Sequence, residues 1–270
     1  MIIWIASYPK SGNTWVRSFL TNYFSNDNDF SFKQLNKIKK FPNKDLFNEL
    51  NIDYSNFNNV PSSWILMQEY INLKNEIVYF KTHNAMATIN NNKFTDSNNT
   101  IGFIYLVRDP RDVVLSYASH LGNSVDDTFD LMQDNFSFEL DADNIEARSV
   151  LLGSWAANYN SWKSFNSVEG LIIRYEDLVM KPKNSFLKII EYLHKISGLN
   201  INLQKIDKCI SNTRFDKLQN LEITKGFKEK GVNSFFRKGI VGDWKENLDP
   251  KIIKKIEVKF IKEMKELGYL

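Results

Sequence analysis

A short string near the start of the chain, YPKSGNTW at residues 8–15, combines residue types that bind anions. It joins an apolar segment, Ile2–Ser7, to a helical pattern at Thr14–Phe24. In such a strand-to-helix turn the backbone amides converge and the helix dipole attracts negative charge. The turn adds a flexible glycine, two hydroxyls and an ammonium group, from Gly12, Ser11, Thr14 and Lys10. Because the lysine precedes the glycine, the string differs from the nucleotide-triphosphate loop GxxxxGK[ST] and predicts another kind of anion site.

A second set of anion-binding residues follows the apolar segment Phe103–Val107. Arg108 comes directly after this segment, and Ser116 lies about one helical turn beyond the next loop. A guanidinium holds a phosphate in a fixed orientation, and a serine hydroxyl can donate a further hydrogen bond. If the two apolar segments are neighbouring parallel strands, Arg108 and Lys10 reach the same edge of the sheet. The sequence therefore predicts a ligand with two separated phosphate-like groups.

A candidate general base is His83, in the string KTH that follows the apolar segment Ile77–Phe80. Imidazole can accept a proton near neutral pH, and Lys81 projects the same way along an extended chain. A structural hydrogen bond is the alternative interpretation of a histidine at a strand end. We keep that structural interpretation for the two other histidines, His120 and His194.

The elements that carry these residues can be predicted from the hydrophobic pattern. Four apolar runs without polar alternation are typical of strands that helices cover on both faces; they are Ile2–Ser7, Ile77–Phe80, Phe103–Val107 and Leu171–Arg174. Helical patterns lie at Thr14–Phe24, Asp112–His120, Ser149–Phe165, Ser185–Ile196 and Pro250–Leu267. This alternation predicts an α/β fold of three layers, with a mostly parallel central sheet, in a single domain of residues 1–270.

Three segments lack a regular pattern. We expect short helices and loops over the sheet edge at Asn26–Val60, and an ordered loop or lid at Ile223–Val241. The acidic segment Gly122–Glu146 contains no lysine or arginine and is expected to be a solvated loop. The alternative is that it lines the entrance of a site for a cationic or neutral substrate. Three aromatic residues could belong either to an apolar pocket or to the core: Trp64, Phe136 and Phe138.

Composition limits the class of protein. The 270 residues are 43% hydrophobic, which suffices for a packed core and excludes a wholly disordered chain. A net charge of +3 is too small for a polybasic nucleic-acid binder. The single cysteine, Cys209, excludes internal disulfides and cysteine-based metal clusters, and favours a reducing compartment. The apolar start, Met1–Tyr8, is too short for a signal peptide or a membrane span, so we expect a soluble, cytoplasmic protein.

Five motifs together resemble those of the soluble sulfotransferases that use 3′-phosphoadenosine 5′-phosphosulfate (PAPS). The family's 5′-phosphosulfate loop reads YPKSGTTW, where this chain has YPKSGNTW. Its 3′-phosphate segment resembles RDPRDVVLSY at 108–117, and its catalytic string resembles KTH at 81–83. The strings YED at 175–177 and FFRKGIVGDWK at 235–245 also match. The motifs occur in the family's order, which makes the set far more specific than any one member.

The resemblance implies a P-loop-like sulfotransferase fold and a role for each matching residue. The 5′-phosphosulfate would be held by Lys10, Ser11, Gly12, Asn13, Thr14 and Trp15. The 3′-phosphate would be held by Arg108, Ser116, Arg237, Lys238 and Gly239, and the adenine would contact Trp15, Tyr175 and, by a weaker match, Thr213 and Phe215. His83 would be the base, Lys10 would neutralise the leaving phosphate and Lys81 would stabilise the sulfuryl oxygens. Ser116 would pair with Lys10 before substrate arrives, and no metal ligand is expected.

The resemblance also leaves several points open. Asn13 replaces a threonine of the family loop, and its amide could still donate to phosphate. Asn84-Ala85 stands where the family has Leu-Pro, and the family's dimerisation string is not recognisable, so either a monomer or a homodimer is expected. The acceptor is expected to be a small molecule with a hydroxyl or amine, with no nucleic-acid or membrane partner. The alternative functions are a P-loop-type nucleotide kinase and a non-catalytic nucleotide-binding protein.

Overall fold

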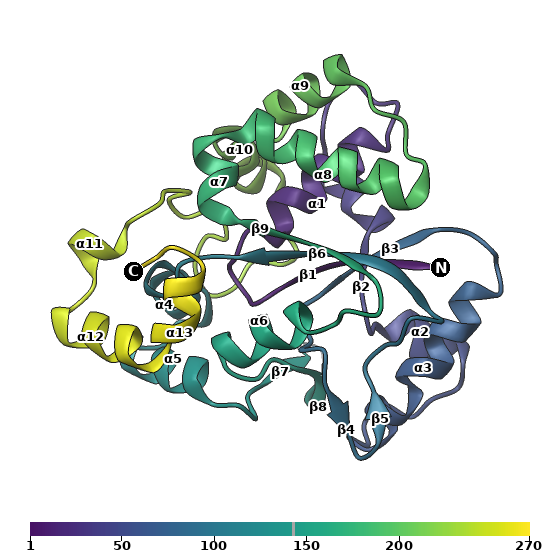
Figure 1. The fold of residues 1–270 in the computed structure, drawn as a ribbon, viewed down its shortest axis with the longest axis horizontal. Helices are drawn as coiled ribbons and strands as arrows, with labels where there is room; N and C mark the ends of the chain where they lie inside the picture. The colour runs from purple at the N-terminus through teal and green to yellow at the C-terminus, as the bar shows by residue number, and fades with distance from the viewer. Residues whose placement is uncertain (142–143) are drawn as a thin grey trace.

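A parallel sheet of five strands forms the centre of the molecule, in the order β2-β3-β1-β6-β9 (Figure 1). The computed structural model describes residues 1–141 and 144–270, without the side chains at 140–149. The strands are β1 (Ile2–Ser7), β2 (Lys39–Lys40), β3 (Val78–Thr82), β6 (Thr100–Val107) and β9 (Glu169–Arg174). The predicted α/β fold with a mostly parallel sheet is confirmed, and the structure adds the short edge strand β2.

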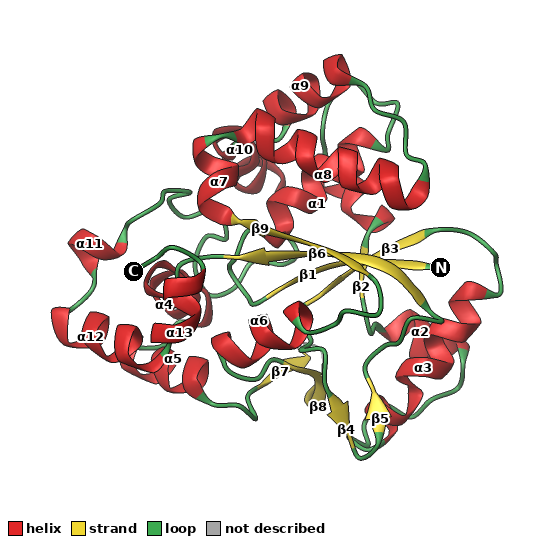
Figure 2. Cartoon of the chain, viewed as in Figure 1, coloured by secondary structure: helices red, strands yellow, loops and turns green. Residues whose placement is uncertain are grey.

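Helices cover both faces of this sheet (Figure 2). Successive side chains of a strand point to opposite faces, so the continuous apolar run of β1 needs cover on both sides. Trp4 packs in one cluster with residues of α6 (Trp155–Lys163) and α12 (Pro250–Lys259). Ile5 packs in the opposite cluster with residues of α1 (Asn13–Tyr23) and α8 (Pro182–Ser197). The result is the three-layer arrangement that the alternation of elements predicts.

The remaining elements surround these three layers. The helices are η1 (Phe32–Lys37), α2 (Lys44–Glu49), α3 (Asn59–Asn72), α4 (Pro110–Leu121), α5 (Val125–Gln133), α7 (Tyr175–Met180), α9 (Leu203–Asn212), α10 (Phe215–Lys225), α11 (Trp244–Asn247) and α13 (Ile261–Glu266). Two hairpins pair β4 (Thr88–Ile89) with β5 (Asn92–Lys93), and β7 (Phe138–Asp141) with β8 (Asn144–Leu151). Among the described helices, none combines the length and the apolar character that crossing a membrane requires.

Three predicted segments differ from the structure. The helix predicted at Pro250–Leu267 is divided at Phe260 into α12 and α13. The helix predicted at Ser149–Phe165 begins only at Trp155, because β8 extends to Leu151 and the Ser154 hydroxyl caps α6 by accepting from the Ala157 N–H. The acidic segment Gly122–Glu146 is not simply a loop, since it contains α5, β7 and the start of β8. The Ser124 side chain caps α5, and acidic residues in its first turn favour the helix dipole.

The register of the sheet brings three strand ends to one edge. β1 lies between β3 and β6, with Ala6 opposite Thr82 and Ser7 opposite Leu106. The residues that follow these strands therefore emerge side by side at the carboxyl edge, where α/β sheets bind ligands.

Candidate active site

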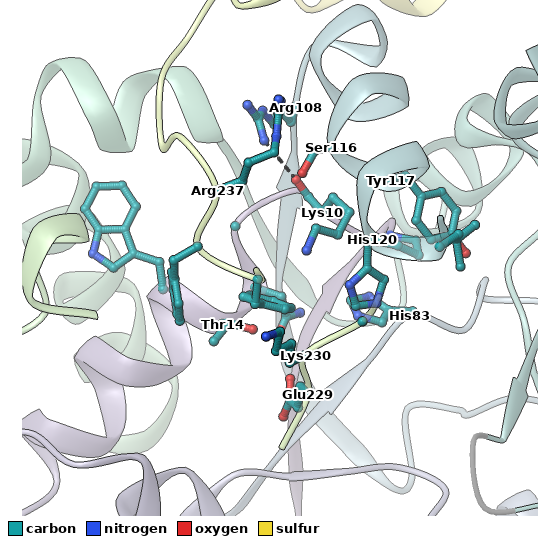
Figure 3. A pocket seen from close by; sticks show the side chains of 18 of the residues that line it. Lys10, Thr14, His83, Arg108, Ser116, Tyr117, His120, Glu229, Lys230 and Arg237 are labelled. Atoms are coloured by element: carbon teal, nitrogen blue, oxygen red, sulfur yellow. Dashed lines mark hydrogen bonds between the residues drawn. The ribbon is translucent and has the colours of Figure 1, made fainter. Parts of the chain in front are cut away.

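A cavity of about 830 Å³ opens at this edge. Figure 3 shows Lys10, His83, Arg108 and Ser116 around it, although they come from distant parts of the chain. The residues predicted from sequence that line it are Lys10, Gly12, Asn13, Thr14, Trp15, Lys81, His83, Arg108, Ser116, Tyr175, Phe215, Arg237, Lys238 and Gly239. Two predicted residues do not line it: Ser11 and Thr213 are fully buried, and the Thr213 hydroxyl donates to the Cys209 carbonyl at 2.8 Å.

The turn after β1 has a backbone that its sequence explains. Gly12 precedes α1 with φ at +97°, a conformation that residues with a Cβ rarely adopt. A Cβ added there would also lie 2.7 Å from the Tyr175 ring. Glycine thus lets α1 begin directly at the cavity, with the free N–H groups of its first turn at that end.

Asn13 requires a correction to its predicted role. Its side-chain nitrogen donates to the Ile5 carbonyl at 2.9 Å and to the Ser7 hydroxyl at 3.2 Å, so both amide hydrogens are already engaged. The amide therefore ties the turn to β1. It also supports Ser7, whose hydroxyl lies 3.2 Å from His83 Nδ1.

The tautomer of His83 follows from its hydrogen bonds. Nδ1 lies 2.8 Å from the Ser7 carbonyl oxygen, which can only accept, so Nδ1 carries the proton. Nε2 is then unprotonated in the neutral ring and has no hydrogen-bond partner among the described residues. Burial, assisted by the nearby Lys81 ammonium, lowers the pKa of His83 to about 4. At neutral pH the ring is therefore neutral and able to accept a proton at Nε2.

Lys10 is a cation without a carboxylate partner in the described structure. Its ammonium lies 3.6 Å from the centre of the Phe235 ring. Burial and the neighbouring positive charges of Arg108 and Lys81 lower the pKa of Lys10 to about 7. Among the described residues no hydrogen bond joins Lys10 to Ser116, so their predicted pairing stays a prediction.

Arg108 is oriented by backbone carbonyls and one ring. Its guanidinium donates to the Lys10 carbonyl at 3.3 Å and to the Ile240 carbonyl at 3.0 Å, and it lies 4.3 Å from the centre of the Tyr175 ring. Arg108 Nε is buried without a hydrogen-bond partner among the residues that the structure describes. The Arg108 guanidinium is thus held in one orientation, and its Nε–H donor remains unused.

The late loop, residues 226–243, brings further cations to the cavity. Arg237 and Lys238 both bind the Asp243 carboxylate, at 2.7 and 2.6 Å. Asp112 of α4 anchors the end of this loop by accepting from the Gly242 and Trp244 N–H groups. The segment predicted as a lid is therefore ordered and attached to the sheet edge.

Two ion-pairing carboxylates at the site, Glu229 and Glu139, were not singled out from the sequence. The Glu229 carboxylate reaches from the late loop to Lys81 and Arg17, at 2.8 Å each. Glu139 lies 3.3 Å from Lys40 at the side of the cavity nearest His83. His120 also lines the cavity, whereas His194 lies outside with Nδ1 2.9 Å from the Leu199 carbonyl. No sequence signal marks these pairings, since each joins segments far apart in the chain.

The three aromatic residues left open by the sequence have different positions. Phe138 lines the cavity, together with Leu121 and Leu131. Trp64 is 1% exposed in the core, and Phe136 is 80% exposed at the surface. The part of the cavity beyond His83 thus has a mixed apolar and polar lining, as a site for a small organic molecule would require.

Comparison with known proteins identifies the class to which this arrangement belongs. The model of the sulfotransferase domain matches residues 2–268, so the chain belongs to the sulfotransferase family. It is an enzyme of sulfuryl transfer, which the predicted resemblance had indicated, and family membership favours this reaction over that of a nucleotide kinase.

Several curated and solved proteins are similar to the chain. Sulfotransferase 1B1 of Canis lupus familiaris is 28% identical, over 96% of this chain and 82% of the relative. Sulfotransferase 1E1 of Rattus norvegicus is 27% identical, over 97% of this chain and 83% of the relative. A retinol dehydratase in complex with androsterone and the inactive cofactor PAP has a TM-score of 0.62 at 18% identity, over 98% and 80% of the two chains. Mouse sulfotransferase SULT7A1 complexed with PAP has a TM-score of 0.61 at 20% identity, over 98% and 84%.

Proposed function

We propose that the enzyme transfers the sulfuryl group of PAPS to a hydroxyl or amine of a small-molecule acceptor and releases 3′-phosphoadenosine 5′-phosphate (PAP). Residues 1–270 act as one domain. The setting is the cytoplasm, where a reducing environment suits a chain whose single cysteine is buried. One observation carries the proposal: His83 presents an unprotonated Nε2 to a cavity that Lys10, Lys81 and Arg108 also line.

The unused donors of the site fit a nucleotide with two anionic groups. Arg108 Nε, at the cavity, and Ser11 Oγ, which does not line it, are both buried without partners among the described residues. Of the two, only the Arg108 donor belongs to the cavity, and such an unpaired donor normally indicates a missing ligand or water. Ser11 lies in the turn before α1, and Arg108 follows the neighbouring strand β6. We assign the 5′-phosphosulfate to the turn and the 3′-phosphate to Arg108, with Ser116, Arg237, Lys238 and Gly239 beside it.

Aromatic side chains offer a place for the adenine. Trp15 lies 6.2 Å from Tyr175 between ring centres, and both line the cavity with Phe215. Trp15 Nε1 is buried without a partner, so this pocket also has an unused donor. Because Trp15 and Tyr175 meet edge to face, at 67°, adenine would stack on the face of one ring rather than between the two. Thr213 would support this pocket only indirectly, since its hydroxyl is already bonded.

The bound donor supplies an electrophilic sulfuryl group attached to a phosphate leaving group. His83 accepts the acceptor's proton at Nε2 while Ser7 holds the other ring nitrogen, an effect typically of order 10²–10⁴ in rate. Lys10 compensates the negative charge that grows on the phosphate, and Lys81 stabilises the sulfuryl oxygens. The site thus combines a neutral base with two lysine cations near the reacting groups.

Product identification tests this proposal. The enzyme is incubated with PAPS labelled with ³⁵S in the sulfuryl group and with pooled metabolites, and the labelled product is identified. The His83→Ala variant should lose label transfer by at least about 10²-fold while binding PAP as the wild type does. His194→Ala, which removes an imidazole outside the cavity, is the matched control. The proposal fails if the wild type does not bind PAP, or if His83→Ala transfers label at the normal rate.

A further inference from the structure

A single carboxylate of the late loop connects two buried cations at the sheet edge. Glu229 Oε2 accepts from Lys81 Nζ at 2.8 Å, and Glu229 Oε1 accepts from Arg17 Nη1 at 2.8 Å. The three residues belong to the late loop, to the end of β3 and to α1. Figure 3 shows Glu229 at the edge of the cavity that Lys10 and His83 line.

The Arg17 side of this bridge is the fixed one. Arg17 is 3% exposed, and its second terminal nitrogen donates to the Ile38 carbonyl at 3.0 Å. Its third nitrogen, Nε, is buried without a partner, so Glu229 provides its only counter-charge among the described residues. Removing one partner of a buried ion pair leaves an uncompensated charge and is strongly unfavourable. In this closed arrangement Arg17 therefore anchors the Glu229 carboxylate.

We propose that Glu229 is a positioning residue that holds the Lys81 ammonium, in its charged form, where the sulfuryl group is transferred. This inference rests on the proposed function. An ammonium has three N–H donors, and Glu229 engages one of them, which leaves two for the sulfuryl oxygens. Without a carboxylate at this place, burial and the positive charge of Arg17 would both favour the neutral amine.

The same bridge makes the position of Lys81 depend on the late loop. This loop covers the cavity, with the Val232 N–H donating to the His120 carbonyl at 3.0 Å and Phe235 beside Lys10. In other enzymes, loops that close over substrates open again to release product. An opening of this loop would break both contacts of Glu229, the one with Arg17 and the one with Lys81. The charged, oriented lysine is thus assembled only when the loop is closed.

The test is the isosteric variant Glu229→Gln, which keeps the size of the side chain but removes its charge. We expect the turnover number, measured as label transferred from PAPS, to fall roughly ten- to hundredfold. A displaced Lys81 ammonium would stabilise the oxygens of the transferring sulfuryl group less well than a correctly positioned one. The dissociation constant for PAP should stay within about threefold, since PAP has no sulfuryl group. Hydrogen exchange of the backbone amides at 227–236 should become faster. Glu246→Gln, on the exposed surface of α11, is the matched control.

A double-mutant cycle then shows whether Glu229 acts through Lys81. In a Lys81→Gln background the Glu229→Gln change should reduce turnover by less than about threefold, because the group it positions is already absent. Thermal unfolding of each variant checks that the fold is retained. The inference is overturned if the two losses multiply, if Glu229→Gln leaves turnover unchanged, or if it tightens PAP binding, which would make Glu229 a competitor of the nucleotide. These outcomes are distinct from a failure of the proposed function, in which the wild type itself transfers no label.

Discussion

The protonation of Lys10 should couple nucleotide binding to pH. In the free enzyme, burial and the charges of Arg108 and Lys81 lower the pKa of Lys10 to about 7. A bound phosphate would place negative charge beside the ammonium and raise its pKa again. The bound state therefore holds a proton that the free state loses above pH 7. PAP binds most tightly at pH values below the pKa of Lys10 in the free enzyme. Its affinity declines as the pH rises from 7 towards the pKa of Lys10 in the complex.

The size of this effect can be worked out from the free pKa. If the pKa in the complex returns to about 10, the dissociation constant of PAP should rise roughly 15-fold between pH 7 and pH 8.5, or about 1.6 kcal/mol. The two histidines of the cavity do not contribute, because burial lowers the pKa of both His83 and His120 to about 4.

Isothermal titration calorimetry of PAP at pH 8.5, in two buffers of different ionisation enthalpy, measures the number of protons taken up. We expect close to one proton for the wild type and close to none for Lys10→Arg, because a guanidinium stays protonated. The Arg variant should also show a flatter dependence of affinity on pH. If the wild type takes up no proton, or if both proteins take up the same number, the reasoning about Lys10 is refuted.

Three further predictions concern His83, Arg108 and Gly12. Because the pKa of His83 is about 4, kcat/KM for the acceptor, measured at saturating PAPS, should show no loss from pH 7 down to pH 5.5; a loss of more than half by pH 6 would indicate an ordinary imidazole. Arg108→Ala should weaken binding of PAP at least tenfold more than binding of adenosine 5′-phosphate, by calorimetry, and equal losses would place the 3′-phosphate elsewhere. Gly12→Ala should lower the melting temperature and weaken PAP binding, because the new Cβ would lie 2.7 Å from Tyr175. Gly198→Ala, also at positive φ but with open space around it, should share only the backbone strain of about 1 kcal/mol and leave PAP binding unchanged.

The sequence predicted the part of the site that depends on local connectivity. Lys10, His83 and Arg108 each follow a short apolar run whose length and residue types predict a buried strand, and parallel strands place the residues after them at one edge. The helix boundaries near Ser154 and Ser124 were less predictable. A polar segment can form a helix, a hairpin or a loop. Here the pairing of β7 with β8 takes up the residues between the two helices α5 and α6.

Only the tertiary structure showed the partners of these residues. Asn13 was expected to donate to phosphate, but the amide lies within reach of the Ile5 carbonyl and the Ser7 hydroxyl. Glu229 joins Lys81 and Arg17 across 148 and 212 residues of the chain. A hydrophobic pattern fixes which face of an element is buried, and therefore which residues emerge at its end. It does not encode which distant loop packs against that end, because such contacts arise only after the layers have assembled.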